Sequence, residues 1–274
     1  MSTVFVQLSD LHIRQPGQLT YRRIDTAAYL KKAIQSIVKR QEHISAVVIT
    51  GDLVDFGRVE EYGHLAKLLE PLSMPVYLLA GNHDHPVHLR EVFSSHTYLG
   101  TQGPIQYCVD IGSIRLVALD TSVKNASHGE LAADQLAWLS HVLDLNKDRS
   151  VVIAMHHPPF LTGIHHMDQQ NLKVGNDSFK QLIAQHKNIQ HIICGHVHRP
   201  ISIQYAHTVA SIAPSPAHQV ALDLMPDGPS RWLLEPGAYR VLTAIPGQSI
   251  VNHMAYVDSF DGPYPFYENG RLID

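Results

Sequence analysis

Short apolar runs recur along the first two thirds of the chain, and each is followed by Gly, Asp, Asn or His. They are Val4–Leu8, Ala46–Thr50, Val76–Ala80, Ile114–Leu119, Val151–Met155 and Ile189–Cys194. Their shortness and their content of β-branched residues are typical of strands buried inside a layered sheet. We therefore predict a buried strand at each of the six runs.

Stretches with apolar residues at helical spacing separate these runs. They are Ile24–Val38, Val59–Leu69, Glu130–Leu143 and Asn176–Gln185, the last starting with the cap-like Asn176-Asp177-Ser178. Alternation of strands and helices favours an α/β fold with helices packed on both sides of the sheet structure.

The pattern changes after Arg199. Short runs separated by Pro and Gly replace the helical periodicity, at Ile201–Tyr205, Thr208–Ala213, Gln219–Met225, Ala238–Ala244 and Ile250–Val257. We expect antiparallel strands there. This change predicts two parts of the chain. Residues 1–215 form a catalytic domain, and residues 216–274 complete its strands and form a small strand-rich appendage. Its aromatic segment, 261–267, is a candidate cap over the site or subunit contact.

Composition narrows the class of protein. The 274 residues are 45% hydrophobic and 17% charged, with a net charge of −4, which excludes wholesale disorder and disfavours a dedicated binder of nucleic acid polymers. No apolar run approaches the roughly 20 residues of a membrane helix. We expect a cytoplasmic protein that does not bind to a membrane. Cys108 and Cys194 lie in apolar runs and are predicted to be small buried side chains.

Polar side chains gather where the predicted strands end, and the chain holds 20 histidines. The groups, in order, are Asp10 and His12, Asp52, then Asn82, His83 and Asp84, then His156 and His157, and finally His196 and His198. The carboxyl edge of an α/β sheet is where ligands bind. We therefore expect these side chains to converge.

Carboxylate, amide and imidazole donors without thiolate suit Fe, Mn, Zn or Co ions. Residues two apart in an extended chain point to the same side, so Asp10 and His12 can hold one ion together. Paired metal ions lie about 3.5–4 Å apart and share a bridging carboxylate. Asp52, after the flexible Gly51, is the predicted bridge.

The five ordered groups resemble the signatures of the calcineurin-like metallophosphoesterases. The resemblance spans residues 10–198 and implies a four-layer α/β/β/α sandwich. Within that superfamily, the chain bears a still closer resemblance to class III cyclic-nucleotide phosphodiesterases and bacterial glycerophosphodiesterases. Segments Phe56–Tyr62, His156–Pro159 and Gly163–Asp168 carry this closer likeness.

The resemblance also implies roles for individual residues. One ion would be held by Asp10, His12, Asp52 and His198 and the other by Asp52, Asn82, His156 and His196. His83, oriented by Asp84, would be the catalytic histidine that faces the substrate phosphate, and Asn82, His83 and His198 would contact substrate. His157 is interpreted as a supporting residue, and the role of His165 and His166 stays open.

The function predicted on these grounds is hydrolysis of 3′,5′-cyclic nucleotides or related small phosphodiesters by a hydroxide at the two-metal centre. The alternative is a glycerophosphodiesterase, and a promiscuous enzyme that hydrolyses both classes of substrate would fit both hypotheses. A metal-lined scaffold without catalysis is the third hypothesis, although this sequence retains every expected ligand. The expected partners are a small phosphodiester substrate and further copies of the chain, joined through the C-terminal region.

Overall fold

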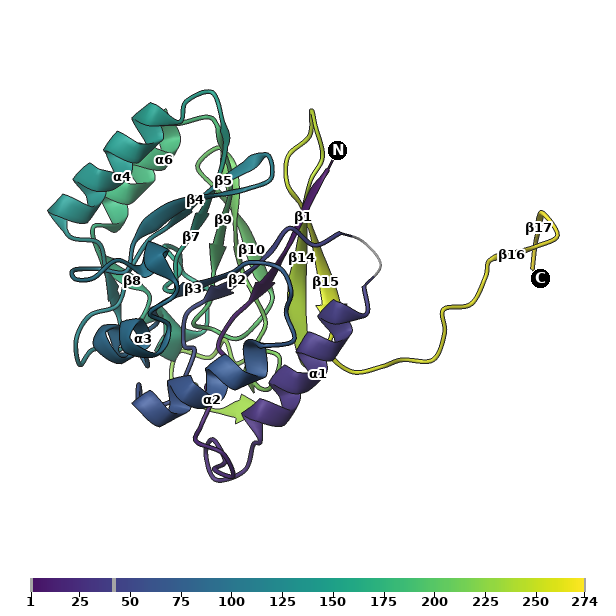
Figure 1. The fold of residues 1–274 in the computed structure, drawn as a ribbon. Helices are drawn as coiled ribbons and strands as arrows, with labels where there is room; N and C mark the ends of the chain where they lie inside the picture. Colours follow the sequence, from purple (N-terminus) through teal and green to yellow (C-terminus); the bar gives the residue numbers. More distant parts are fainter. Residues whose placement is uncertain (1, 41–42, 274) are drawn as a thin grey trace.

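A computed structural model describes residues 2–40 and 43–273 (Figure 1). Two β-sheets pack face to face, and helices cover the outer side of each, which confirms the predicted four-layer α/β/β/α sandwich. The two main hydrophobic clusters follow this layering. One joins the first sheet and its helices to the inner face of the second sheet, and the other lies between the outer face of the second sheet and its helices. Of the described helices, none has the length and apolar character needed to span a bilayer.

The first sheet contains the N-terminal strands. Its order is β15-β14-β1-β2-β3, with β1 at Thr3–Leu8, β2 at Ala46–Thr50, β3 at Val76–Leu79, β14 at Ala238–Ala244 and β15 at Val251–Tyr256. Strands β1, β2 and β3 are parallel, and β14 pairs antiparallel with β1. Helices α1 (Thr26–Val38), α2 (Val59–Leu69) and the shorter α3 (Pro86–Val92) connect or follow these strands.

The second sheet has the order β10-β11-β9-β7-β5-β4. Its strands are β4 (Tyr107–Ile111), β5 (Ile114–Ala118), β7 (Ser150–Ala154), β9 (Ile189–Cys194), β10 (Ile201–Tyr205) and β11 (Thr208–Ile212). Helices α4 (Ala133–Leu145) and α6 (Asn176–Gln185) cover its outer face (Figure 1). The remaining elements are η1 (Thr97–Leu99), α5 (His165–Asp168), β6 (Gly129–Glu130), β8 (Leu172–Val174), β12 (Gln219–Val220), β13 (Trp232–Leu233), β16 (Tyr267–Glu268) and β17 (Arg271–Leu272).

All six buried strands and all four helices predicted from the pattern are present, with small shifts at their ends. Two expectations about the C-terminal part were wrong. Gln219–Met225 forms only the two-residue strand β12, because the chain turns back there to make β13. Strand β11 pairs antiparallel with β10 but parallel with β9, so the region is not purely antiparallel. Cys194 is buried as predicted and Cys108 is half-buried; both are free thiols.

Candidate metal centre

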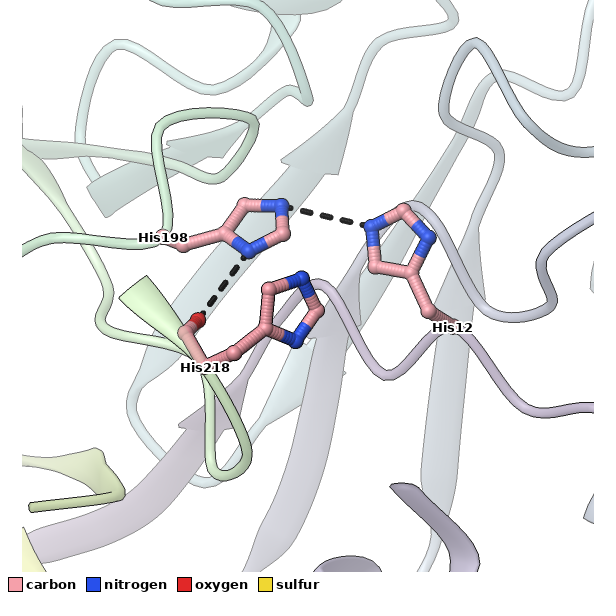
Figure 2. Close-up of side chains that lie close together, drawn as sticks. All are labelled: His12, His198 and His218. Carbon is pink, nitrogen blue, oxygen red and sulfur yellow. Dashed lines mark hydrogen bonds between the residues drawn. The ribbon is translucent and has the colours of Figure 1, made fainter. Parts of the chain in front are cut away.

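The predicted ligands come together at the carboxyl ends of β1, β2, β3, β7 and β9, where the two sheets meet. Oxygen or nitrogen atoms of Asp10, His12, Asp52 and His198 all lie within 4.8 Å of one another, and all four side chains are buried. Nε2 of His12 lies 3.2 Å from Nε2 of His198 (Figure 2). Two lone-pair nitrogens so close together fit a shared cation.

A second group of donors faces the other oxygen of Asp52. Nε2 of His156 lies 3.4 Å from Oδ1 of Asp52, and 3.1 Å from Oδ1 of Asn82. Nδ1 of His196 lies 3.1 Å from the same amide oxygen. Oδ2 of Asp52, by contrast, lies 3.5 Å from Nε2 of His12. The two carboxylate oxygens of Asp52 therefore face two separate donor sets.

Neighbouring groups fix the orientation of three of the imidazoles. Nδ1 of His12 lies 3.2 Å from the Asp55 carboxylate. Nδ1 of His156 lies 2.8 Å from the Thr50 carbonyl oxygen, and Nδ1 of His198 lies 3.1 Å from the His218 carbonyl oxygen. A partner of this kind fixes the tautomer and leaves the Nε2 lone pair available to a metal. His196 differs, because its Nδ1 faces the other donor atoms and its Nε2 is buried without a hydrogen-bond partner among the described residues.

Burial gives the site its electrostatic character. It raises the pKa of Asp10 to about 6, a shift that His156 reduces and Asp52 increases. Burial would also raise the pKa of Asp52, but His156, His83 and His12 hold it well below its ordinary value. Burial lowers the pKa of His196 to about 3, so this imidazole is neutral near pH 7. Against the effect of its burial, the Asp52 charge raises the pKa of His156 to about 9, so this imidazole carries a proton near pH 7 in the absence of an ion. Metal binding needs neutral imidazoles, so His196 is already in the required form whereas His156 would have to release a proton.

His83 lies at the edge of the centre, about a third exposed. Its backbone amide donates to Oδ1 of Asp52, and its Nδ1 lies 2.8 Å from the Asp55 carbonyl oxygen. Asp84 instead accepts hydrogen bonds from the amides of Leu53 and Gly81 and from the Tyr62 hydroxyl. The contact that orients the His83 ring thus comes from Asp55, whereas Asp84 holds the loop backbone.

The segment Phe56–Tyr62, noted in the sequence, serves the same loops. Glu61 is fully buried and accepts hydrogen bonds from the amides of Phe56 and Arg58, while its other oxygen lies 3.2 Å from Arg14. Tyr62 donates to Asp84 and accepts from the amide of His85. The start of α2 therefore ties the loop after β2 to the loop after β3.

The supporting histidines have distinct positions. The His157 ring packs against His156 and His196, and its Nδ1 lies 2.8 Å from the Thr121 hydroxyl. His166 and Met167 line a cavity of about 340 Å³ that opens onto the centre, together with Asn82, His83 and His198. His165 contacts Gln169 instead.

The sequence interpretation missed two residues of the site. Asp55 is buried against His12, and its place three residues after Asp52 was the available signal. The His218 ring lies 4.6 Å from His198 and 5.5 Å from His12, and neither of its ring nitrogens has a hydrogen-bond partner among the described residues (Figure 2). It stands alone in a turn of Pro, Ser and Ala, so nothing in its spacing marked it.

Comparisons with known proteins agree with this geometry. The family model described as calcineurin-like phosphoesterase matches residues 3–200. A probable glycerophosphodiester phosphodiesterase from Arcobacter nitrofigilis is 35% identical over 99% of this chain and 100% of its own length. A probable cyclic nucleotide phosphodiesterase from Rhodopseudomonas palustris is 32% identical, over 94% of each chain. A 3′,5′-cyclic AMP phosphodiesterase from Pseudomonas aeruginosa is 30% identical, over 88% of this chain and 90% of the relative.

Solved structures show the same fold at much lower identity. A dimetal phosphatase from Danio rerio superimposes with a TM-score of 0.68 at 15% identity, over 93% of this chain and 96% of that one. A purple acid phosphatase from yellow lupin gives the same TM-score and identity, over 100% of this chain and 53% of that one.

Proposed function

The chain belongs to the calcineurin-like phosphoesterase family and is a hydrolase of phosphodiesters, and we propose that it cleaves small phosphodiesters at a pair of metal ions bridged by Asp52. The observation that carries the proposal is the placement of the two Asp52 oxygens against separate donor sets. The donors lack thiolate, which supports Fe, Mn, Zn or Co as the ions.

We propose the following division of work among the residues. Asp10, His12, Asp52 and His198 would hold one ion, and Asp52, Asn82, His156 and His196 would hold the other. Such a pair offsets the charge of the phosphodiester and supplies a nucleophile near neutral pH.

His83, whose Nδ1 lies against the Asp55 carbonyl, lines the cavity. In its imidazolium form its Nε2–H would give a proton to the leaving alkoxide, and the ring would remain as the neutral imidazole. His198, which lines the same cavity, completes the substrate contacts with Asn82 and His83.

Both substrate classes have support. The relative matched over the whole chain carries the name of a glycerophosphodiesterase, and two others carry names of cyclic-nucleotide phosphodiesterases. The 340 Å³ cavity has an aromatic wall in which Tyr21 and Trp232 stack at 5.5 Å, a surface that can also take a nucleobase. A scaffold role is disfavoured because every expected ligand is in place.

The proposal predicts the behaviour of Asp52→Asn. Because the bridging charge is lost, the variant should retain fewer than two ions per chain and lose at least about 10³-fold in turnover of bis-p-nitrophenyl phosphate with Mn(II). Metal analysis by mass spectrometry and the colorimetric assay measure the two effects. A variant that keeps two ions and normal turnover contradicts the proposal, as does a wild-type protein inactive with each of the four metals.

We further propose that the chain after residue 215 does not fold as a unit separate from the catalytic domain, because His218 and Trp232 line the same cavity as the proposed ligands. Strand β14 hydrogen-bonds to β1 and β15 to β14, so these two strands complete the first sheet. Residues 258–273 form the C-terminal arm. The arm begins against α1, where Asp258 pairs with Lys32, and its end, with β16 and β17, extends away from the sandwich (Figure 1). The arm displays Phe260, Tyr264, Phe266 and Tyr267, each at least 64% exposed.

An arm with so many exposed aromatic side chains suits a contact with another copy of the chain. The double variant Phe266→Ser/Tyr267→Ser should therefore shift the protein to a smaller assembly in sedimentation velocity. Leu145→Ser, at a residue 70% exposed on α4, is the matched control and should leave the assembly unchanged. A wild-type monomer at micromolar concentration would refute the contact.

A further inference from the structure

A second cavity lies beside the metal centre and shares two residues with the first. Its volume is about 880 Å³, and Asn82 and His83 line both this cavity and the 340 Å³ cavity described above. The residues of the loop after β3 therefore form the wall between two spaces. A phosphate bound at the centre would lie where the two cavities meet.

The two cavities differ in character. The smaller one has the aromatic pair Tyr21 and Trp232 together with Met167 and Val220. The larger one is lined by the apolar side chains of Phe56, Pro86, Val87 and Val123, by segment 101–104 and by two basic residues. The stacked aromatic pair thus belongs to the smaller cavity, whereas the larger one combines a partly apolar wall with two cationic groups.

The basic residues of the larger cavity have no acidic partner. The guanidinium of Arg90 donates to the carbonyl oxygens of Leu99, Gln102 and Gly103, and among the described residues no carboxylate forms an ion pair with it. Lys124 is exposed and, within residues 2–40 and 43–273, forms neither a hydrogen bond nor an ion pair.

The two carboxylates that line this cavity are both engaged. Asp120 accepts hydrogen bonds from the amides of Ile105 and Ser122 and from the Ser122 hydroxyl, and Asp84 is bonded as described above. Burial and the charges of His88 and Lys124 lower the pKa of His85, which also lines the cavity. Lys124 and Arg90 thus leave positive charge available to a ligand.

Taking the proposed function as its basis, we propose that the larger cavity holds one ester arm of a linear phosphodiester and that Lys124 and Arg90 select arms bearing a carboxylate. The phosphate lies at the metal centre beside Asn82 and His83, and the other ester arm enters the smaller cavity. A 3′,5′-cyclic nucleotide has both ester oxygens on a single sugar and fills only one of the two spaces. A linear diester, such as a glycerophosphodiester with an acidic headgroup, fills both.

Two substrates that differ only by a carboxylate test the charge selection. These are glycerophosphoserine and glycerophosphoethanolamine, assayed by kcat/KM with Mn(II). In Lys124→Glu the ratio of the serine to the ethanolamine ester should fall about 10-fold, which corresponds to about 1.4 kcal/mol. Lys124→Arg should keep the wild-type ratio. Lys31→Glu, the same charge change at an exposed position on α1 outside both cavities, should leave the ratio within about twofold of wild type.

A second pair of variants tests whether an ester arm occupies the larger cavity. Val87 lines the larger cavity and is 63% exposed, so Val87→Trp fills space without disturbing the core. It should lower kcat/KM for both glycerol esters at least about 10-fold relative to methyl p-nitrophenyl phosphate, whose second arm is one methyl group. Val38→Trp, at a residue 52% exposed on α1, is the control and should lower neither.

The outcomes separate this inference from the proposed function. A wild-type protein that hydrolyses no phosphodiester overturns both. Normal hydrolysis with an unchanged ester ratio in Lys124→Glu, or equal losses for all substrates in Val87→Trp, overturns only the two-cavity inference. So does a wild-type kcat/KM for cyclic AMP above that for glycerophosphoserine.

Discussion

At the scale of single residues, five of the seven proposed metal ligands have a left-handed backbone. Their φ angles are 55° at Asp10, 45° at His12, 49° at Asp52, 75° at His196 and 57° at His198. Such angles are uncommon for residues with a Cβ and cost of order 1–3 kcal/mol each. The surrounding structure holds these residues in strained conformations, and their side chains are among those that gather at the proposed centre.

His83 can be tested by its dependence on the leaving group. A proton donor matters most for a poor leaving group, so His83→Gln should reduce kcat for a glycerophosphodiester about 10²–10⁴-fold and should reduce it much less for bis-p-nitrophenyl phosphate. The measurement is steady-state kinetics with both substrates, accompanied by metal analysis. Equal losses for both substrates would indicate a structural role, and loss of metal would show that His83 is a ligand.

At the scale of elements, the site depends on loops that are pressed together after the strands. A Cβ added at Gly81 would overlap Oδ1 and the amide nitrogen of Asp52 and would come within 2.9 Å of the His156 ring. The loops after β2, β3 and β7 are therefore in direct contact, and the position of the bridging carboxylate depends on the absence of a side chain there.

Gly81→Ala tests this contact. The methyl group should displace Asp52, so we expect loss of at least one of the two ions and a fall in activity of about 100-fold or more. Gly63→Ala, in α2 with nothing within 4 Å of the added Cβ, is the matched control. It should keep both ions and raise the free energy of unfolding by up to about 1 kcal/mol, because Ala favours the helix. Full metal content in Gly81→Ala would contradict the argument.

At the scale of the whole molecule, a cluster of polar side chains joins the two sheets away from the metal centre. His191 of β9 lies 2.8 Å from the Ser211 hydroxyl of β11, and Asn252 of β15 donates to the same oxygen. Arg240 of β14 reaches across to the Ile212 carbonyl. Burial lowers the pKa of His191 to about 4, and the Arg240 charge adds to the shift.

This depressed pKa predicts acid sensitivity. The unfolded chain takes up a proton near pH 6.5 and the folded chain only near pH 4, so stability is complete above the first value and falls as the pH drops toward the second. At about pH 5 His191 by itself should account for a loss of about 2 kcal/mol. Urea unfolding with a chelator present should show a smaller loss in His191→Gln. The exposed control His253→Gln should behave as wild type, and an identical loss in all three proteins would refute the prediction.

The elements could be predicted because their causes are local. Apolar runs and helical spacing in the sequence already place α2 and α6 at their observed bounds, and the order of strand-end ligands indicates a two-metal site. These patterns depend on residues near one another in the chain, and the hydrophobic effect acts on them wherever the strands finally pair.

The tertiary structure alone decided which groups meet from distant segments. It placed the Asp55 carbonyl, and not Asp84, against the His83 ring, brought the isolated His218 to the centre, and set β11 parallel to β9. Each outcome depends on packing between segments far apart in the chain, which leaves no periodic trace in the sequence. The second cavity has the same origin, because its walls come from several loops and from helices α3 and α4, which meet only once the two sheets have packed together.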